Sequence, residues 1–110
     1  MVTHEYHSWM ESDTQDNSKA TASRAAPKEG LAHFVTSVAG SFDGTASDKA
    51  LVLKEGTTEL GRWTAPDQET LYIAFPSPIK LSPGTAANLE LDASGSGGTS
   101  GTAALTGYTL

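Results

Sequence analysis

The chain has 110 residues, of which 37% are apolar, contains no cysteine and carries a formal net charge of −6 at pH 7. This length fits one small domain. The lack of cysteine excludes a disulfide framework and a thiolate metal site. The acidic balance, without a basic stripe, argues against binding to nucleic acid or to anionic membranes.

The start of the chain holds a cluster of large apolar side chains, Tyr6, Trp9 and Met10, in the stretch HEYHSWM. It has neither a basic segment nor a long apolar run, so we expect no signal peptide. No stretch of the chain approaches the ~20 apolar residues that cross a bilayer.

Residues 11–29 contain nothing larger and more apolar than alanine and have no clear periodicity. Such a stretch buries too little surface to offset its ordering entropy, which predicts a mobile or extended tether. We therefore expect residues 1–29 to form an extended N-terminal arm and residues 30–110 to form the folded domain.

Residues 31–42 predict the first strand of that domain. Their period-two alternation places Phe34 and Val38 on the same face. An Asp-Gly turn signal follows the strand.

Residues 49–63 predict a β-hairpin with its turn at Glu55–Gly56. On its return arm we expect Leu60 to face inward, and Arg62 and Trp63 to take opposite faces.

A further strand is predicted at 69–75, which is rich in β-forming residues. Three prolines follow, at Pro76, Pro78 and Pro83, and they confine residues 79–81 to a short edge segment.

Residues 94–101 consist only of serine, glycine and threonine, and alone would suggest a flexible linker. The alternation of Leu89 and Leu91 before them, and of Leu105 and Tyr108 after them, instead predicts a loop between two firm strands.

These six to eight short strands, with no convincing helix, predict an all-β fold. The expected architecture is a small β-sandwich of jelly-roll or Greek-key type, with an extended N-terminal arm. The order of the strands does not follow from the sequence.

Metal sites and catalytic groups are poorly represented. His4 and His7 are the nearest approach to a metal pair, but no helix aligns them, and Glu5 or His33 would have to complete the site. We expect solvated histidines and no metal site.

The chain has no G-x-S-x-G nucleophile motif. Its turn carboxylates, such as Glu55 and Asp67, are typical of solvated groups and not of a catalytic pair. The sequence therefore favours a non-enzymatic protein without a cofactor, in which His33, Arg62 and Trp63 are possible interface residues.

Three segments together, GLAHFVTSVAGSFDG, ALVLKEGTTELGRW and PIKLSPGTAANLELDASGSGGTSGTAALTGYT, carry a family resemblance. Over roughly residues 30–109 the chain resembles the small structural proteins encoded near the major capsid gene of tailed bacteriophages. The resemblance implies a cement, or decoration, protein: a β-sandwich that sits as an oligomer on the outer capsid surface, over contacts between major capsid subunits.

On this interpretation the partner is the major capsid protein, and the protein is a homo-oligomer, a trimer in preference to a dimer, assembled in the host cytoplasm and located on the virion. We expect Tyr6, Trp9 and Met10 to anchor the arm in a groove of a neighbouring subunit.

The main alternative is a carbohydrate- or receptor-binding β module of a phage tail or fibre, with Trp63 and Tyr72 as stacking platforms. A small hydrolase is the third and least favoured alternative.

Overall fold

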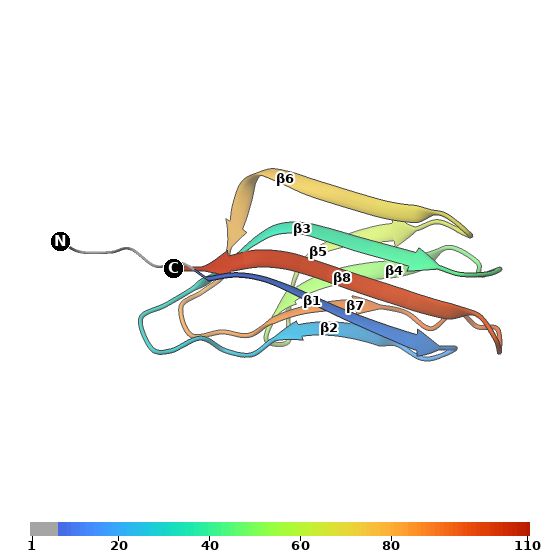
Figure 1. The fold of residues 1–110 in the computed structure, drawn as a ribbon, viewed down its shortest axis with the longest axis horizontal. Helices are drawn as coiled ribbons and strands as arrows, with labels where there is room; N and C mark the ends of the chain where they lie inside the picture. Colours follow the sequence, from blue (N-terminus) through green and yellow to red (C-terminus); the bar gives the residue numbers. More distant parts are fainter. Residues whose placement is uncertain (1–6) are drawn as a thin grey trace.

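The computed structural model describes residues 7–110, which form eight strands in two four-stranded antiparallel sheets (Figure 1). The strands are β1 (His7–Asp16), β2 (Ala20–Arg24), β3 (His33–Phe42), β4 (Lys49–Glu55), β5 (Thr58–Ala65), β6 (Thr70–Lys80), β7 (Ala87–Leu91) and β8 (Ser100–Thr109).

The strand order is β1-β8-β3-β6 in one sheet, here called sheet A, and β2-β7-β4-β5 in the other, sheet B. The first strand pairs with the last, the second with the seventh, the third with the sixth, and the fourth with the fifth. This is the order of one long antiparallel ribbon wound on itself, which is a jelly roll. The prediction of an all-β sandwich is confirmed.

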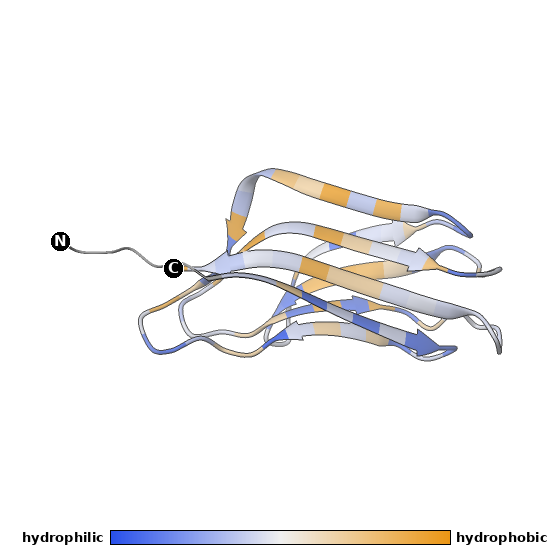
Figure 2. Ribbon diagram, viewed as in Figure 1, coloured by the Kyte–Doolittle hydropathy of each residue, from blue (hydrophilic) through white to orange (hydrophobic). Residues whose placement is uncertain are grey.

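The core lies between the two sheets and is built from alternate positions of the central strands. In β7 and β8 every second residue is buried, as period-two alternation requires. Apolar residues recur accordingly along the ribbon (Figure 2). Five leucines have no exposed surface, and each contributes about 1.5–3 kcal/mol of hydrophobic stabilisation. They are Leu51, Leu53, Leu89, Leu91 and Leu105.

The expected division between an arm at 1–29 and a domain at 30–110 is wrong for residues 7–24. These residues form β1, which pairs with β8 along its whole length, and β2, which pairs with β7. Small side chains are sufficient here because Ala20 and Ala22 fill the narrow space between the sheets and are fully buried. Residues 1–6 lie outside the described residues.

Two predictions of side-chain direction are also wrong, and β-bulges explain both. In β3 the pairing shifts between Val35 and Ser37, which places Phe34 and Val38 on opposite faces. In β5 a shift opposite Leu53 and Lys54 leaves Leu60 39% exposed. A bulge inserts one residue, so it reverses the alternation on which the predictions depended.

The proline-rich stretch is part of β6, which is a single strand and not a separate short segment. β6 is an edge strand of sheet A, as expected for a segment with prolines. Its pairing with β3 is interrupted between Ala74 and Ile79, and the ribbon bends there (Figure 1).

In the glycine-rich stretch at 94–101, residues 94–99 form a loop and residues 100–101 already belong to β8, so the strand predicted after the loop is confirmed. The Ser94 side chain is buried and donates a hydrogen bond of 2.8 Å to the carbonyl oxygen of Thr99. Gly95 and Gly98 adopt positive φ values, which favour glycine. β8 then runs through the middle of sheet A, between β1 and β3.

Candidate functional site

Trp9 is buried in the core and is only 7% exposed. It lies on β1 opposite Gly107 of β8, and its ring occupies the space that a side chain at Gly107 would need. The expected role of Trp9 as an exposed anchor is therefore wrong. The sequence signal that was missed is Gly107 itself, which lies far along the chain and which only strand pairing brings opposite the indole.

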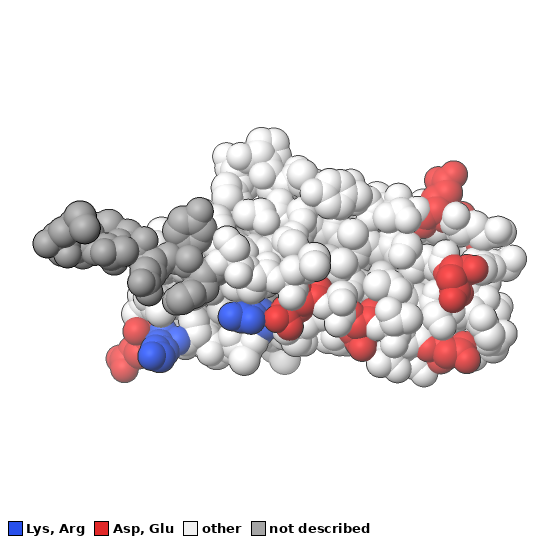
Figure 3. All heavy atoms as spheres, in the orientation of Figure 1, with Lys and Arg blue, Asp and Glu red and all other residues white. Residues whose placement is uncertain are grey.

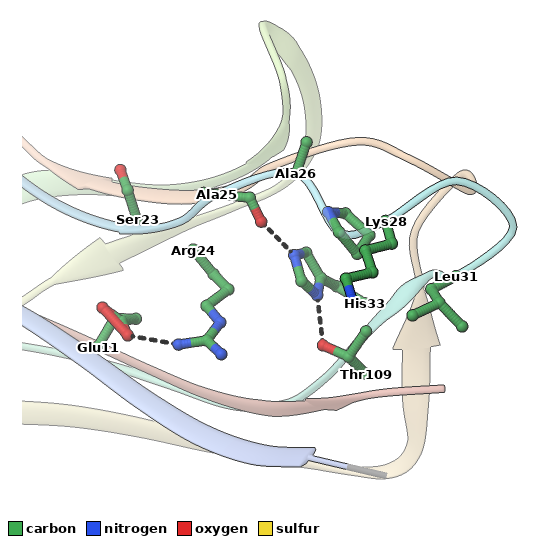
Figure 4. A pocket seen from close by; sticks show the side chains of 10 residues that line it. Glu11, Ser23, Arg24, Ala25, Ala26, Lys28, Leu31, His33 and Thr109 are labelled. Carbon is green, nitrogen blue, oxygen red and sulfur yellow. Dashed lines mark hydrogen bonds and ion pairs between the residues drawn. The ribbon is translucent and has the colours of Figure 1, made fainter. Parts of the chain in front are cut away.

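The Trp9 indole belongs to a buried polar chain at one end of the sandwich. Its Nε1–H donates to the Thr109 hydroxyl oxygen at 3.0 Å. His33 joins that oxygen through Nδ1 at 2.7 Å and the Ala25 carbonyl oxygen through Nε2 at 2.7 Å (Figure 4). A carbonyl oxygen can only accept, so Nε2 carries a hydrogen and donates it to Ala25.

His33 is therefore a structural residue. It is 2% exposed, so the expectation that it lies at an interface is wrong. Its ring meets the Trp9 ring edge to face at 5.4 Å. The cluster joins β1, β3, β8 and the segment after β2 in one set of satisfied hydrogen bonds.

An open hollow of about 620 Å³ lies beside this cluster, between β1 and the segment that connects β2 to β3 (Figure 4). The Arg24 guanidinium borders it, 3.2 Å from Glu11 and 5.7 Å from the centre of the Trp9 ring. Arg24 thus already has an ion-pair partner and an aromatic partner within the chain. Within residues 7–110, no group of three or more His, Asp or Glu side chains is placed to hold a metal ion.

The outer surface of sheet A carries mostly small and uncharged side chains, and we call it the A face. Strand pairing arranges its side chains in rows that cross β1, β8, β3 and β6. The rows are Thr14–Thr102–Ser41–Thr70, Ser12–Ala104–Ala39–Tyr72, Met10–Thr106–Ser37–Ala74 and Ser8–Tyr108–Phe34–Lys80.

The charged residues that this face carries are Lys80, at the end of β6, and Asp16, at the end of β1 opposite Ser100, although the chain as a whole carries a net charge of −6. In Figure 3 the centre of this face bears no charged side chain, and the charged groups gather along the lower edge and at one end. Hydroxyl groups pair across the strands, as between Thr14 and Thr102 at 2.8 Å. The result is a surface without net acidic charge.

Large apolar groups are exposed on the A face. Met10 is 70% exposed and Tyr72 is 65% exposed, the two highest values among the large hydrophobic residues. Phe34 and Tyr108 stack at 4.9 Å with their ring planes 7° apart. Of the three predicted anchor residues, Met10 is thus on the surface, Trp9 is in the core, and Tyr6 lies outside the described residues.

Arg62 and Trp63 lie on β5, at the opposite side of the sandwich from β1, and take opposite faces as predicted. Arg62 is exposed and pairs with Glu59 at 2.7 Å. Trp63 is half-buried, covers Gly61 of its own strand, and meets the Phe75 ring of β6 at 5.9 Å.

Comparison with known proteins assigns no family to this chain. The sequence matches no protein-family model, and no curated protein matches it. Over residues 7–110 the structure has no helix that is long and apolar enough to span a membrane.

Proposed function

We propose that this chain is a non-enzymatic cement protein of a tailed-bacteriophage virion, which docks on the outside of the capsid through the A face. The observation that carries the proposal is the A face, which has few charged residues and exposes Met10 and Tyr72. Methionine and tyrosine are typical anchors of protein interfaces, whereas acidic residues are depleted from interface cores.

The proposed partner is the major capsid protein, at the contacts between its subunits. Short side chains let the sheet approach another protein closely, and the hydroxyl groups can hydrogen-bond to the partner surface. Jelly rolls occur in viral capsid proteins and in lectins, so the fold is compatible with the role but is an analogy and not an argument for it.

Weak binding by each copy is sufficient for this role. A shell presents many equivalent sites, and copies that associate with one another bind cooperatively through multivalency. The homo-oligomer expected from the sequence is part of this proposal, as are the virion location and assembly in the host cytoplasm. The sequence suggested that the N-terminal arm binds the capsid. We propose instead that the A face, which includes Met10, is the binding surface.

The test is the occupancy of capsids by the double variant Met10→Lys and Tyr72→Lys. Both side chains are exposed, so we expect the variant to fold and its occupancy of capsids to fall by more than tenfold in co-sedimentation, since each anchor contributes about 1–2 kcal/mol. The control is Leu31→Lys, at an exposed apolar position outside the A face. Undiminished occupancy by the double variant, with an unchanged melting curve, would overturn the proposal.

The alternative function, a carbohydrate- or receptor-binding module of a phage tail or fibre, is favoured by one observation. The Tyr72 ring is 65% exposed, as a sugar-stacking ring requires. Trp63 fits this role less well because its ring already contacts Gly61 and Phe75. A glycan array decides between the two: glycan binding that Tyr72→Ala abolishes, without binding to capsids, would support the alternative.

A further inference from the structure

The two sides of the sandwich are closed in different ways. On one side β1 and β2, which end the two sheets, are joined by polar contacts. The Thr21 amide donates to the Asp13 carboxylate at 2.9 Å, and Arg24 pairs with Glu11 at 3.2 Å. On the other side β5 and β6 end the sheets but make little contact with each other.

This second side, which we call the open side, leaves apolar core residues partly exposed. The inward-facing positions of β6 pack against the core but are only half-buried, whereas the equivalent positions of β7 and β8 are buried. The half-buried apolar residues along this side are Trp63, Leu71, Ile73, Phe75 and Ile79. Contiguous apolar surface of this kind marks an interaction site in a soluble protein.

Charge is distributed unevenly along the open side. Asp67 and Glu69 lie in the connection between β5 and β6, at one end. Lys80 ends β6 at the other end. At the Lys80 end, Glu59 pairs with Arg62 at 2.7 Å, and the Glu55 carboxylate accepts a hydrogen bond of 2.8 Å from the Ser82 amide. The open side is therefore acidic at one end and apolar in the middle, and carries Lys80 at the other end.

We propose that a second copy of this chain covers the open side in a two-fold symmetric dimer, with β6 of one copy antiparallel to β6 of the other. In an isologous interface each copy offers the same surface. The antiparallel arrangement brings Lys80 of each copy to Glu69 of the other and buries the apolar residues of both. A parallel arrangement would place acidic end on acidic end, which is unfavourable in a chain with a net charge of −6.

Ala74 and Lys80 also belong to the A face, but this inference concerns the edge and the inward-facing residues of β6, and it does not depend on the proposed function. It also replaces the trimer that the resemblance favoured with a dimer, because two-fold symmetry matches the antiparallel distribution of charge. Purified protein without capsids is sufficient to test it.

The first test is the mass of the purified protein by sedimentation equilibrium. We expect twice the chain mass of 11.4 kDa at micromolar concentration. A single-chain mass at every concentration would overturn the inference, as would a three-chain mass, which two-fold symmetry forbids.

The second test uses the natural lack of cysteine in the chain. Ala74 lies midway between residues 69 and 80 on β6, so the two-fold axis passes close to it. We expect Ala74→Cys to form a disulfide-linked dimer on mild oxidation, since a disulfide requires Cα atoms within ~7 Å. The matched control is Ala26→Cys, exposed and outside the open side. Equal crosslinking of the two variants would overturn the two-fold arrangement.

The third test exchanges the charges at the two ends. Glu69→Lys alone and Lys80→Glu alone should each weaken dimerisation about tenfold, because each places like charges opposite one another. The double variant should restore it, since the pairs are re-formed with opposite polarity. The paired exchange Lys28→Glu and Glu29→Lys, outside the open side, is the control. Additive loss in the Glu69–Lys80 double variant would overturn the predicted contact.

Discussion

The indole N–H of Trp9 donates a hydrogen bond of 3.0 Å to the hydroxyl oxygen of Thr109, and so joins residues one hundred positions apart in the chain. The two residues lie on β1 and β8, which pair along the whole of β1. The same hydroxyl bonds to the His33 ring at 2.7 Å. The aromatic residue that the sequence suggested for binding a partner is thus used to close the chain's own fold.

Replacement of Trp9 tests this structural role. We expect Trp9→Ala to lower the free energy of unfolding by about 3–5 kcal/mol, because it leaves a large cavity in the core. The adjacent exposed residue provides the control: Met10→Ala should change stability by no more than about 0.5 kcal/mol. Urea denaturation measures both, and equal stability of the two variants would contradict the burial of Trp9. For the same reason, deletion of residues 2–12 should unfold the domain.

The Thr109 hydroxyl is tested by a substitution that keeps the shape of the side chain. We expect Thr109→Val to lower the free energy of unfolding by about 1–3 kcal/mol, because the Trp9 N–H is left without an acceptor in a buried site. Thr64→Val, at an exposed position of β5, is the control. A Thr109→Val variant as stable as the control would show that the buried hydrogen bonds contribute nothing net.

Gly107 should tolerate no side chain. A Cβ atom there would lie 2.8 Å from the Trp9 ring and would collide with the Phe34 carbonyl oxygen. We expect Gly107→Ala to lower the free energy of unfolding by about 3 kcal/mol, as overpacking against the backbone does. Gly97→Ala, where no atom lies within 4 Å of the added Cβ, should be nearly neutral. Thermal unfolding of the two variants, followed by circular dichroism, provides the comparison, and similar midpoints would refute the prediction.

Glu90 should make stability depend on pH. Its carboxylate pairs with Lys19 at 3.0 Å and Lys54 at 3.1 Å. Burial raises the pKa of Glu90, but the hydrogen bonds and charges of the two lysines together lower it by more than burial raises it. The pKa therefore lies below its usual value of 4.5. A folded-state pKa below the unfolded one adds stability above the unfolded pKa, and this stability is lost as the pH falls through the folded pKa.

We therefore expect Glu90→Gln to lower the free energy of unfolding at pH 7 by about 1 kcal/mol. The difference from the parent protein should shrink as the pH falls through the folded-state pKa, because Glu90 is then protonated in both states. Glu29→Gln, at an exposed position outside the sheets, is the control and should leave stability unchanged over the same pH range. A Glu90→Gln effect that keeps the same size from pH 7 through the acid range would rule out the ion pairs as its cause.

Local patterns were good predictors of strands and poor predictors of which face a residue takes. The opposite faces of Arg62 and Trp63 followed from alternation alone, because one continuous strand carries both residues. The same rule wrongly placed Phe34 and Val38 on one face, because a bulge lies between them. No residue in the segment signals that bulge, which depends on the strands that pair on either side of β3.

The A face could not be predicted for a related reason. Met10, Tyr72 and Lys80 lie far apart in the chain, and only the pairing of β1, β8, β3 and β6 places them on one surface. The open side of the sandwich likewise exists only because β5 and β6 are both terminal strands. Neither surface has a local sequence motif.

The sequence by itself determined the all-β class, the hairpin around residues 55–56 and the strand after the glycine-rich loop, because alternation and turn residues act over a few neighbouring positions. Only the tertiary structure decided that residues 7–24 belong to the sandwich. Their strands contain few large apolar residues and are held by backbone pairing with β7 and β8, whose partners lie far along the chain. The composition of a segment shows how much apolar surface it can bury. Backbone pairing with distant strands decides whether the segment becomes part of the sheet.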